Sequence, residues 1–408
     1  MAAPLENQPF KRKGDKENSE FFEKYLLEIY KKRKAQGLEE LIGHIHHFLI
    51  QVELGKAKDL IAEKLLHTPF LYHGSFEHEA FRYHILRVAE QTPDLLIREP
   101  KVELNDNFYH LNMIAPKGRH LPHTRYIGEA FGVSDLKQVY QILYNQNQVQ
   151  FQEALSENPA KNFTAWTHPS TFTNNCIGYI EYTSGEKQYQ KDNDWNFDDE
   201  TIAKFKLAKD MFKTFSLEQY VGPIDHFATR VYSHDREHAI LEYLSLSNYW
   251  FWGAYNIGDQ NSSTNVCRNL QGLPESQSPA KVFTANNTPF YVNHIDNLPC
   301  PTENFVRNYG RRLHHIAYGV KDGFIGAEEN NHKNVDYVVD QLKKAHMKFL
   351  DHVIGSCEEG LKQIFSQKSK SSLLITEYIQ RCDQFDGFFT KENVAALTQA
   401  AGLDDLIT

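Results

Sequence analysis

The 408-residue sequence has little cysteine, and what it has is scattered. No two of the five cysteines form a CxxC pair; they are Cys176, Cys267, Cys300, Cys357 and Cys382. An odd number of widely spaced cysteines argues against a disulfide framework and against a cysteine-ligated zinc site. We therefore expect a protein of a reducing compartment, with the cytoplasm as the default location.

Long apolar runs and an excess of positive charge are also missing. The strongest apolar cluster, Tyr249–Tyr255, is far shorter than the roughly 18 residues that a membrane-spanning helix needs. The N-terminal segment has no apolar core of the kind found in signal peptides, so we expect neither a signal peptide nor a membrane partner. Lys and Arg total 44 against 53 Asp and Glu, and the net charge of −9 makes nucleic acid an unfavourable partner.

Apolar residues make up 41% of the chain and aromatic residues 13%, which is enough for a folded protein of two to three domains. We expect a helical N-terminal extension over residues 1–67, an α+β domain over 68–215 and a second α+β domain over 216–408. The helical expectation for the extension comes from one set of apolar residues at i, i+3, i+4 spacing, namely Leu38, Leu41, Ile42, Ile45, Leu49 and Val52. A basic run at residues 31–34 suits the last turn of a helix better than a binding patch.

In residues 68–215 the sequence pattern that indicates secondary structure is weaker. Alternating aromatic and β-branched residues predict strands over 108–114 and 176–183, and residues 198–215 read as a helix.

The C-terminal half carries a repeated order of elements, strand–helix–strand–strand–strand. The first copy is predicted over 224–232, 236–246, 249–255, 263–269 and 281–292, and the second over 313–320, 335–345, 348–353, 361–367 and 373–380, with a last helix near 392–401. The first strand of each copy contains a histidine followed by an apolar residue and alanine, at His226 and His315. This weak repeat predicts paired βαβββ modules whose first strands lie side by side.

A carboxylate joins this pair of histidines in the last strand of the second copy. Glu377 shares the face of Ile375 and Ile379, and an unpaired carboxylate on the core face of a strand is costly. Two histidines and one carboxylate are the ligand set of non-haem Fe(II) oxygenases, which leaves open positions for a 2-oxo acid and O₂. We therefore predict a metal site at His226, His315 and Glu377.

Several short segments in this order resemble the 4-hydroxyphenylpyruvate dioxygenase family, a two-domain group of the vicinal oxygen chelate superfamily. They are Ile224–His226, Leu313–Ala317, Leu361–Phe365, Thr376–Arg381 and, more loosely, Phe388–Asn393. The resemblance implies Fe(II) held by the three predicted ligands, and oxidative decarboxylation of a 2-oxo acid with O₂. It also implies that four residues lie near the substrate: Gln363, Phe389, Asn393 and Asn293. Residues 68–215 then correspond to the family's degenerate N-terminal module, and we expect a homo-oligomer, by default a dimer.

Some residues depart from the family pattern. His314 stands where the family has glutamine, and Val394 stands where it has a phenylalanine that stacks on an aromatic substrate. Arg311 and Arg312 replace small residues, and they either meet an extra carboxylate on a different substrate or face solvent. We therefore expect a retained metal site with an altered substrate wall.

Other histidine groups are weaker candidates for a metal site: His44, His46 and His47, expected on a helix; His120 and His123, expected in a surface turn; and His234 and His238, expected to face solvent. Two alternative functions stay open at this stage. One is extradiol ring cleavage on the same ligand set, and the other is a catalytically silent binding or scaffold protein on the same fold.

Overall fold

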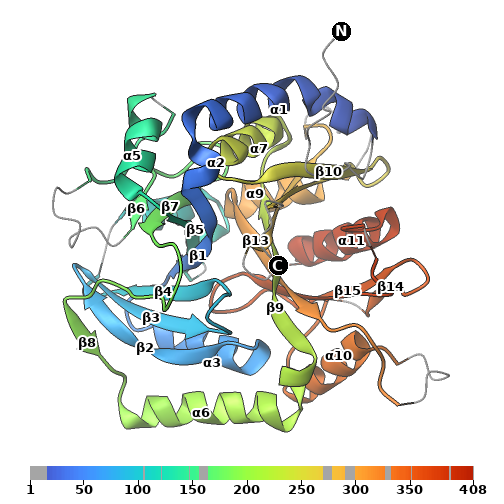
Figure 1. Cartoon of the computed structure of the whole chain (residues 1–408). Helices are drawn as coiled ribbons and strands as arrows, with labels where there is room; N and C mark the ends of the chain where they lie inside the picture. The colour runs from blue at the N-terminus through green and yellow to red at the C-terminus, as the bar shows by residue number, and fades with distance from the viewer. Residues whose placement is uncertain are drawn as a thin grey trace.

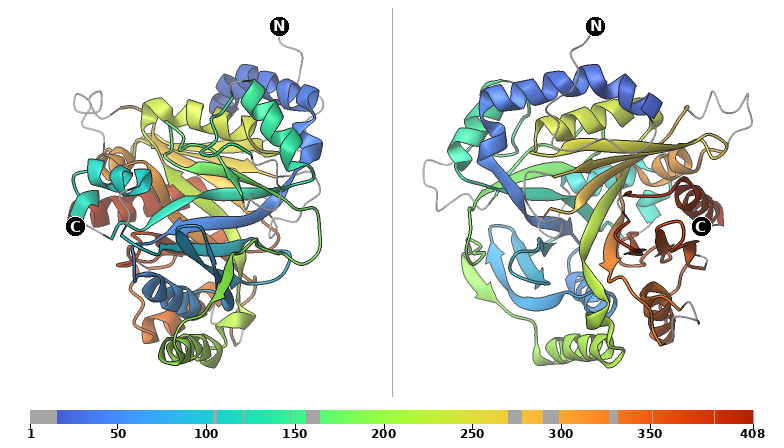
Figure 2. Two further views of the ribbon diagram at one scale, coloured as in Figure 1. Left: turned by 90° about the vertical axis from the view of Figure 1, so that its left-hand side faces the viewer. Right: turned by 45° about the vertical axis from the view of Figure 1, so that its right-hand side comes forward.

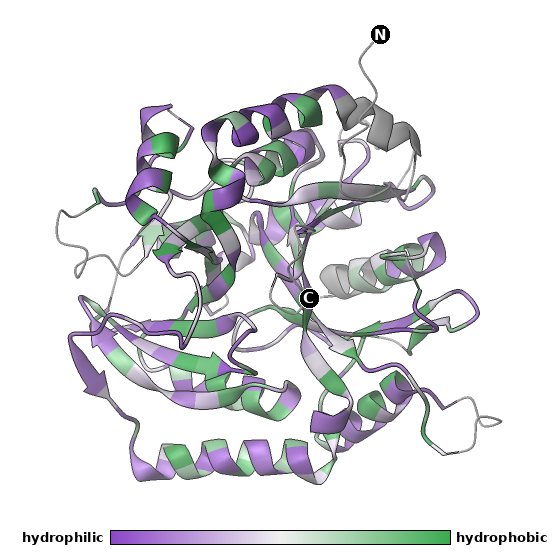
Figure 3. Ribbon diagram, viewed as in Figure 1, coloured by the Kyte–Doolittle hydropathy of each residue, from purple (hydrophilic) through white to green (hydrophobic). Residues whose placement is uncertain are grey.

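The computed structural model describes residues 16–103, 106–120, 122–146, 148–155, 164–269, 278–289, 299–326, 332–350, 352–385 and 387–407. Two eight-stranded mixed sheets form the centre of the molecule, and helices cover them on the outside (Figure 1). Hydrophobic residues gather on the strands and on the inward faces of the helices (Figure 3). The sheets pack against each other, with the Phe48 and Phe227 ring centroids 5.1 Å apart in the shared core.

The second sheet is made of two copies of one βαβββ unit, as predicted. The first copy is β9 (Val221–Arg230), α7 (Arg236–Ser245), β10 (Trp250–Ile257), β11 (Ser262–Arg268) and β12 (Ala280–Asn286). The second is β13 (Arg312–Val320), α10 (Asn334–Lys344), β14 (Ile354–Ser356), β15 (Leu361–Phe365) and β16 (Ile375–Arg381). The strand order β10-β11-β12-β9-β13-β16-β15-β14 places β9 and β13 as an antiparallel pair at the centre, each with a parallel neighbour, β12 or β16. The strand predicted over 348–353 is wrong, since β14 begins at Ile354.

The first sheet has the same plan with one strand displaced. Its elements are β1 (Ile42–Gln51), α3 (Ala57–His67), β2 (Leu71–His78), β3 (Phe81–Arg87), β4 (Asp94–Pro100), β5 (Arg125–Val133), α5 (Leu136–Asn145), β6 (Ala165–Trp166), β7 (Cys176–Glu181) and β8 (Asn193–Trp195). β1 and β5 form the central antiparallel pair, with parallel neighbours β4 and β7. β8 pairs with β2 at the opposite edge from β6, and α6 (Asp199–Thr214) then leads into the second sheet.

Two predictions of secondary structure are wrong. Residues 42–51, placed in a helical extension, form a central strand of the first sheet. This strand is buried on both faces over most of its length, so its apolar residues do not alternate with exposed polar ones and also satisfy a helical spacing. Residues 108–114, predicted as a strand, lie in α4 (Asn107–Ile114), where the Asp106 side chain accepts the backbone N–H of Tyr109 and caps the helix.

The N-terminal helix α1 (Lys16–Gln36) lies over α7 and β10 of the second half, and Figure 2 shows it spanning that side of the molecule. Arg33, from the basic run, is 1% exposed and donates to the carbonyl oxygens of Leu244 and Ser247 at 2.9 and 3.0 Å. A short helix, α2 (Leu38–Leu41), then turns the chain into β1. Two further helices flank the second sheet, α9 (Pro301–Tyr309) and the predicted C-terminal helix, α11 (Lys391–Ile407).

One disulfide is present, although the spacing of the cysteines argued against a disulfide framework. Cys357, in the turn between β14 and β15, is bonded to Cys382 at the end of β16. Cys176, Cys267 and Cys300 are buried and do not take part in a disulfide. The cytoplasmic location and the homodimer stay predictions. Within the described parts of the chain, no helix combines the length and the apolar character needed to cross a membrane.

Candidate metal centre

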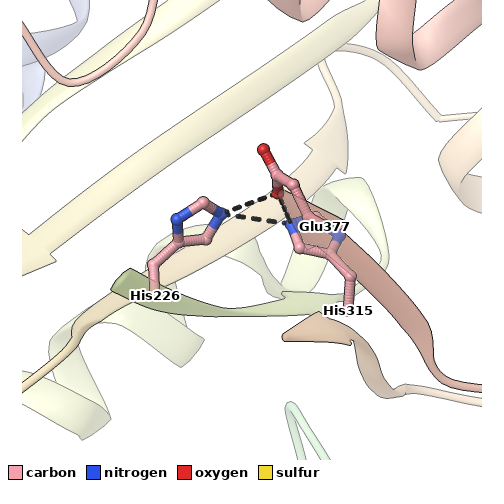
Figure 4. Close-up of side chains that lie close together, drawn as sticks. All are labelled: His226, His315 and Glu377. Atoms are coloured by element: carbon pink, nitrogen blue, oxygen red, sulfur yellow. Dashed lines mark hydrogen bonds and ion pairs between the residues drawn. The ribbon is translucent and has the colours of Figure 1, made fainter. Parts of the chain in front are cut away.

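The three predicted metal ligands come together on the inner face of the second sheet. In the central antiparallel pair, His226 of β9 faces Ala317 of β13, and Glu377 of β16 is the parallel neighbour of the same Ala317. His315 precedes Ala317 by two residues, and side chains two residues apart on a strand share a face. The small Ala317 side chain leaves room in the middle, so the three longer side chains point into one space (Figure 4).

The donor atoms are spaced as ligands of a single ion. His226 Nε2 lies 3.1 Å from Glu377 Oε2 and 3.3 Å from His315 Nε2, and His315 Nε2 lies 3.3 Å from Glu377 Oε2. Two atoms about 2.1 Å from one ion lie about 3.0 Å apart at a right angle and about 3.4 Å apart at a tetrahedral angle. The geometry therefore fits one ion and is compatible with either coordination.

Burial makes a cation at this point favourable. His226, His315 and Glu377 are 0%, 6% and 1% exposed. Apart from the two histidine Nε2 atoms near its Oε2, the Glu377 carboxylate has no hydrogen-bond partner among the described residues. A buried carboxylate with so few partners is costly, and a bound cation lowers that cost. Of the described residues, no other group of three His, Cys, Asp or Glu side chains is arranged to hold an ion.

His226 is oriented by a second layer of charge. Its Nδ1 lies 2.7 Å from Asp225 Oδ1, and Asp225 in turn accepts hydrogen bonds from Arg381. Burial alone raises the pKa of Asp225, but Arg381 and the bond to His226 outweigh burial and hold that pKa well below its ordinary value. The carboxylate thus keeps a proton on Nδ1 and leaves the Nε2 lone pair for the ion, as in many metal sites.

Charge differs between the two histidines. Burial lowers the pKa of His226, but the negative charges of Glu377 and Asp225 outweigh burial and raise it to about 9. Burial lowers the pKa of His315 well below 6.5, and the positive charges of His226 and Arg230 lower it further. The His315 Nδ1 lies 2.8 Å from Nδ1 of His314, which therefore holds the His315 ring in place.

A cavity opens beside His315 and Glu377. Two of the predicted substrate residues line it, Gln363 from β15 and Phe389. Gln363 is fully buried, and neither its amide oxygen nor its amide nitrogen meets a partner in the described structure. Such an unsatisfied amide is costly in an empty pocket and is suited to a polar ligand. The Phe389 ring stands edge-on to His226, with the centroids 5.3 Å apart.

Of the other two predicted substrate residues, the structure describes only Asn393, which does not line the cavity. Asn393 of α11 is turned toward β15, where its Nδ2 donates to the carbonyl oxygen of Leu361 at 3.2 Å. Its neighbour Val394 lines the cavity together with Leu397 and Thr398, so one face of α11 forms a wall. Asn293 lies outside the described residues.

Neither Arg311 nor Arg312 lines the cavity, and of the two only Arg311 is partly exposed to solvent. Arg311 donates to the Asp235 carboxylate at 2.6 Å, so it neither meets the cavity nor stands free in solvent. Arg312 is 3% exposed and donates to the carbonyl oxygen of Thr124 in the first half at 2.8 Å. The arginine on the cavity wall is Arg230, which the sequence reasoning missed. The spacing along the strand could have identified it, since Arg230 follows His226 by four residues and therefore lies on the same face of β9.

The other histidine groups do not form a second centre in the described structure. His44, His46 and His47 lie on strand β1 and not on a helix. His123 packs its ring against Tyr109 at 4.5 Å, and His234 and His238 are exposed.

Comparison of the sequence with protein-family models and with curated protein sequences finds no match. The fold, by contrast, is a known one, the vicinal oxygen chelate fold of paired βαβββ modules.

Two solved structures show this likeness. A triple mutant of 4-hydroxymandelate synthase from Streptomyces coelicolor superimposes with a TM-score of 0.60 at 15% identity, over 89% of this chain and 99% of that one. A fusion protein of a xylose isomerase-like TIM barrel and a 4-hydroxyphenylpyruvate dioxygenase gives a TM-score of 0.53 at 12% identity, over 92% of this chain and 57% of that one. The predicted resemblance is thus confirmed at the level of the fold.

Proposed function

We propose that this protein is a mononuclear non-haem Fe(II) dioxygenase that acts on an aromatic or related 2-oxo acid. The observation that carries the proposal is the buried cluster of His226, His315 and Glu377, which opens on a cavity containing the unsatisfied amide of Gln363. Two histidines and one carboxylate on one face are the ligand set of such oxygenases. The fold shared with a 4-hydroxymandelate synthase supports the same reaction class.

The residues of the site suit oxidative decarboxylation. When bound, iron supplies the Lewis acidity and the O₂ chemistry through which a 2-oxo acid loses CO₂ and is hydroxylated. Asp225 keeps the Nδ1 proton on His226, so that Nε2 stays a ligand. Gln363 offers one donor and one acceptor to a polar group of the substrate. Phe389 and Val394 supply apolar walls that exclude water from the reacting groups.

Metal content and O₂ uptake test this function together. We expect the full chain to bind about one iron per molecule, and to consume O₂ only with a 2-oxo acid and with matching release of CO₂. Uptake with catechols and without CO₂ would instead indicate extradiol cleavage. Zinc retained in preference to iron, or no metal at all, would contradict an oxygenase and favour a binding protein.

The substrate wall leads to a narrower expectation. Because Val394 replaces a ring that would stack on an aromatic substrate, the loss is about 0.5–1.5 kcal/mol of binding free energy, or about two- to twelvefold in affinity. We therefore expect weak turnover of 4-hydroxyphenylpyruvate relative to other 2-oxo acids. A kcat/KM for 4-hydroxyphenylpyruvate of about 10⁴ M⁻¹s⁻¹ or more would show that the substitutions at His314 and Val394 are neutral.

A further inference from the structure

We propose that His314 presents a fixed hydrogen-bond donor, its Nε2–H, to the cavity, and that this donor recognises a hydrogen-bond acceptor on the substrate. The inference rests on the proposed function, because it adds a specificity-determining residue to the same site. The acceptor is an oxygen or nitrogen lone pair, either in the carboxylate of the 2-oxo acid or in the side chain that it carries. A substrate group that can only donate is disfavoured at this point.

A bulge in β13 brings His314 to the cavity. Neighbouring residues on a regular strand point to opposite faces of the sheet. Leu313 pairs with Thr229 of β9 and His315 pairs with Ala228, so β13 has one extra residue, His314, at this point. Such a bulge re-aims a side chain. His314 and His315 therefore both line the cavity, although they are adjacent in the chain.

The His314 ring is fixed through one of its two nitrogens. Its Nδ1 lies 2.8 Å from Nδ1 of His315, and a hydrogen bond between two ring nitrogens needs one proton between them. The ring also stands edge-on to Phe305, with the centroids 5.0 Å apart. No described residue forms a hydrogen bond with Nε2 of His314, so this nitrogen remains for a ligand in the cavity.

The role of His315 as a metal ligand decides where the two protons lie. His315 contributes its Nε2 to the cluster, 3.3 Å from Nε2 of His226 and 3.3 Å from Oε2 of Glu377. A neutral imidazole that binds an ion through Nε2 carries its proton on Nδ1. His315 then donates to Nδ1 of His314, which must be the acceptor. The single proton of the His314 ring is therefore on Nε2, where it faces the substrate as a donor.

This donor differs from the amide of Gln363, which also lines the cavity. An amide carries both donors and an acceptor, and its rotation lets either group meet a ligand. His314 has no such freedom, because turning its ring would break the bond to His315. A donor-only group placed against a fixed donor is left without a partner in a buried site, and this loss is the basis of discrimination.

Nitrogen NMR of the histidine rings tests the proton positions in the unaltered chain. The full chain, labelled with ¹⁵N-histidine, is loaded with Zn(II), which is diamagnetic and accepts histidine and carboxylate ligands. We expect the proton of His315 on Nδ1 and the proton of His314 on Nε2. A proton on Nδ1 of His314, in a chain whose His315 binds zinc through Nε2, would overturn the inference and leave the metal site intact.

A set of related probes tests the recognition itself. Calorimetry on the Co(II)-saturated full chain without O₂ compares pyruvate, phenylpyruvate and the three pyridylpyruvates, whose ring nitrogen only accepts. His314→Phe keeps a ring but no donor, and it should weaken binding about fivefold, as expected for one neutral hydrogen bond. His314→Gln should recover most of this loss. A loss shared by all probes assigns the acceptor to the 2-oxo acid, and a loss confined to the pyridylpyruvates assigns it to the side chain.

His46→Phe is the matched control. His46 is likewise the extra residue at a bulge, and its Nδ1 lies 2.8 Å from Nδ1 of His47, but it belongs to the first sheet and lies outside the cavity. This variant should bind every probe as the unaltered chain does. Equal binding of all probes by His314→Phe and the unaltered chain would overturn the inference alone. If no 2-oxo acid binds to the metal-loaded chain, the proposed function fails and the inference with it.

Discussion

The two sheets share one architecture, yet of the described residues only those of the second sheet gather three candidate metal ligands. The ladders allow a residue-by-residue comparison. In the first sheet His47 of β1 faces Ala130 of β5, just as His226 of β9 faces Ala317 of β13 in the second. His47 is therefore the positional counterpart of His226, and one of the three ligand positions keeps its residue type.

The other two ligand positions have lost their side chains. Gly128, two residues before Ala130, occupies the place of His315, and Gly178 of β7, beside Ala130, occupies the place of Glu377. The first sheet thus has the register of a metal site and one of its three ligands.

A tryptophan fills the vacated space. A Cβ atom on Gly178 would lie 2.9 Å from the Trp166 ring, and one on Gly128 would lie 1.9 Å from the backbone oxygen of Cys176 and 3.2 Å from the same ring. The His47 and Trp166 ring centroids are 6.0 Å apart. The difference shows that the fold supplies the positions while a few side chains decide whether a position holds an ion or a packed core.

The most direct test of this comparison is to replace, one at a time, the two histidines at equivalent positions, His226 and His47. We expect His226→Ala to lower metal affinity by more than about 100-fold, because changes outside the ligand shell already cost 10- to 100-fold. His47→Ala should leave the metal content of the purified, iron-loaded chain unchanged. Elemental analysis measures both. Loss of metal in the His47 variant, with a normal circular dichroism spectrum, would place an ion in the first sheet and contradict the comparison.

The glycines of the first sheet can be tested by adding one methyl group. Gly128→Ala should lower the free energy of unfolding by about 3 kcal/mol or more, as an overpacked core does, because the new Cβ collides with the backbone of β7. Gly258→Ala is the control, since a Cβ there meets nothing within 4 Å. Urea denaturation gives both values. An unchanged midpoint for Gly128→Ala would mean that the position is open enough for a ligand side chain.

The next test concerns Asp225, the carboxylate that is hydrogen-bonded to His226. Asp225→Asn should weaken metal binding about 10- to 100-fold, because it removes the charge that orients His226 and leaves Arg381 without its carboxylate partner. Titration with Co(II), followed by its visible absorption, measures the loss. An affinity equal to that of the unaltered chain would remove Asp225 from any role in positioning the ligand.

The smallest expected effect is the pH dependence of metal binding, which compares the protonation of His226 with that of His47. Without metal, His226 has a pKa of about 9 and carries a proton at neutral pH, whereas burial lowers the pKa of His47 to about 3 and keeps it neutral. An ion must displace the proton from His226. Apparent affinity for Mn(II) should therefore rise about tenfold per pH unit from pH 6 to 8 and level off above about pH 9. Calorimetry in two buffers of different ionisation enthalpy counts the released proton, and an affinity independent of pH would contradict this account.

Local sequence patterns were sufficient to predict most elements of the second sheet and the cluster of His226, His315 and Glu377. The βαβββ order repeats within the C-terminal half, and alternation along each strand fixes which side chains share a face, so the amino-acid sequence alone could place His226, His315 and Glu377 together. The same local reasoning failed for residues 42–51, because a strand buried on both faces has no alternation to distinguish it from a buried helix.

The tertiary structure alone decided features that depend on contacts between distant segments. Arg311 and Arg312 bond to Asp235 and Thr124, outside the cavity that Arg230 lines, and no spacing in the sequence brings those partners to them. The displaced edge strand β8 and the Cys357–Cys382 bond likewise follow from the path of the chain through space. The two glycines of the first sheet are a further example, because only the pairing of β5 with β1 and β7 shows that Gly128 and Gly178 occupy the positions of His315 and Glu377. A strand determines by itself which way its side chains point, but what those side chains meet is determined by its neighbours.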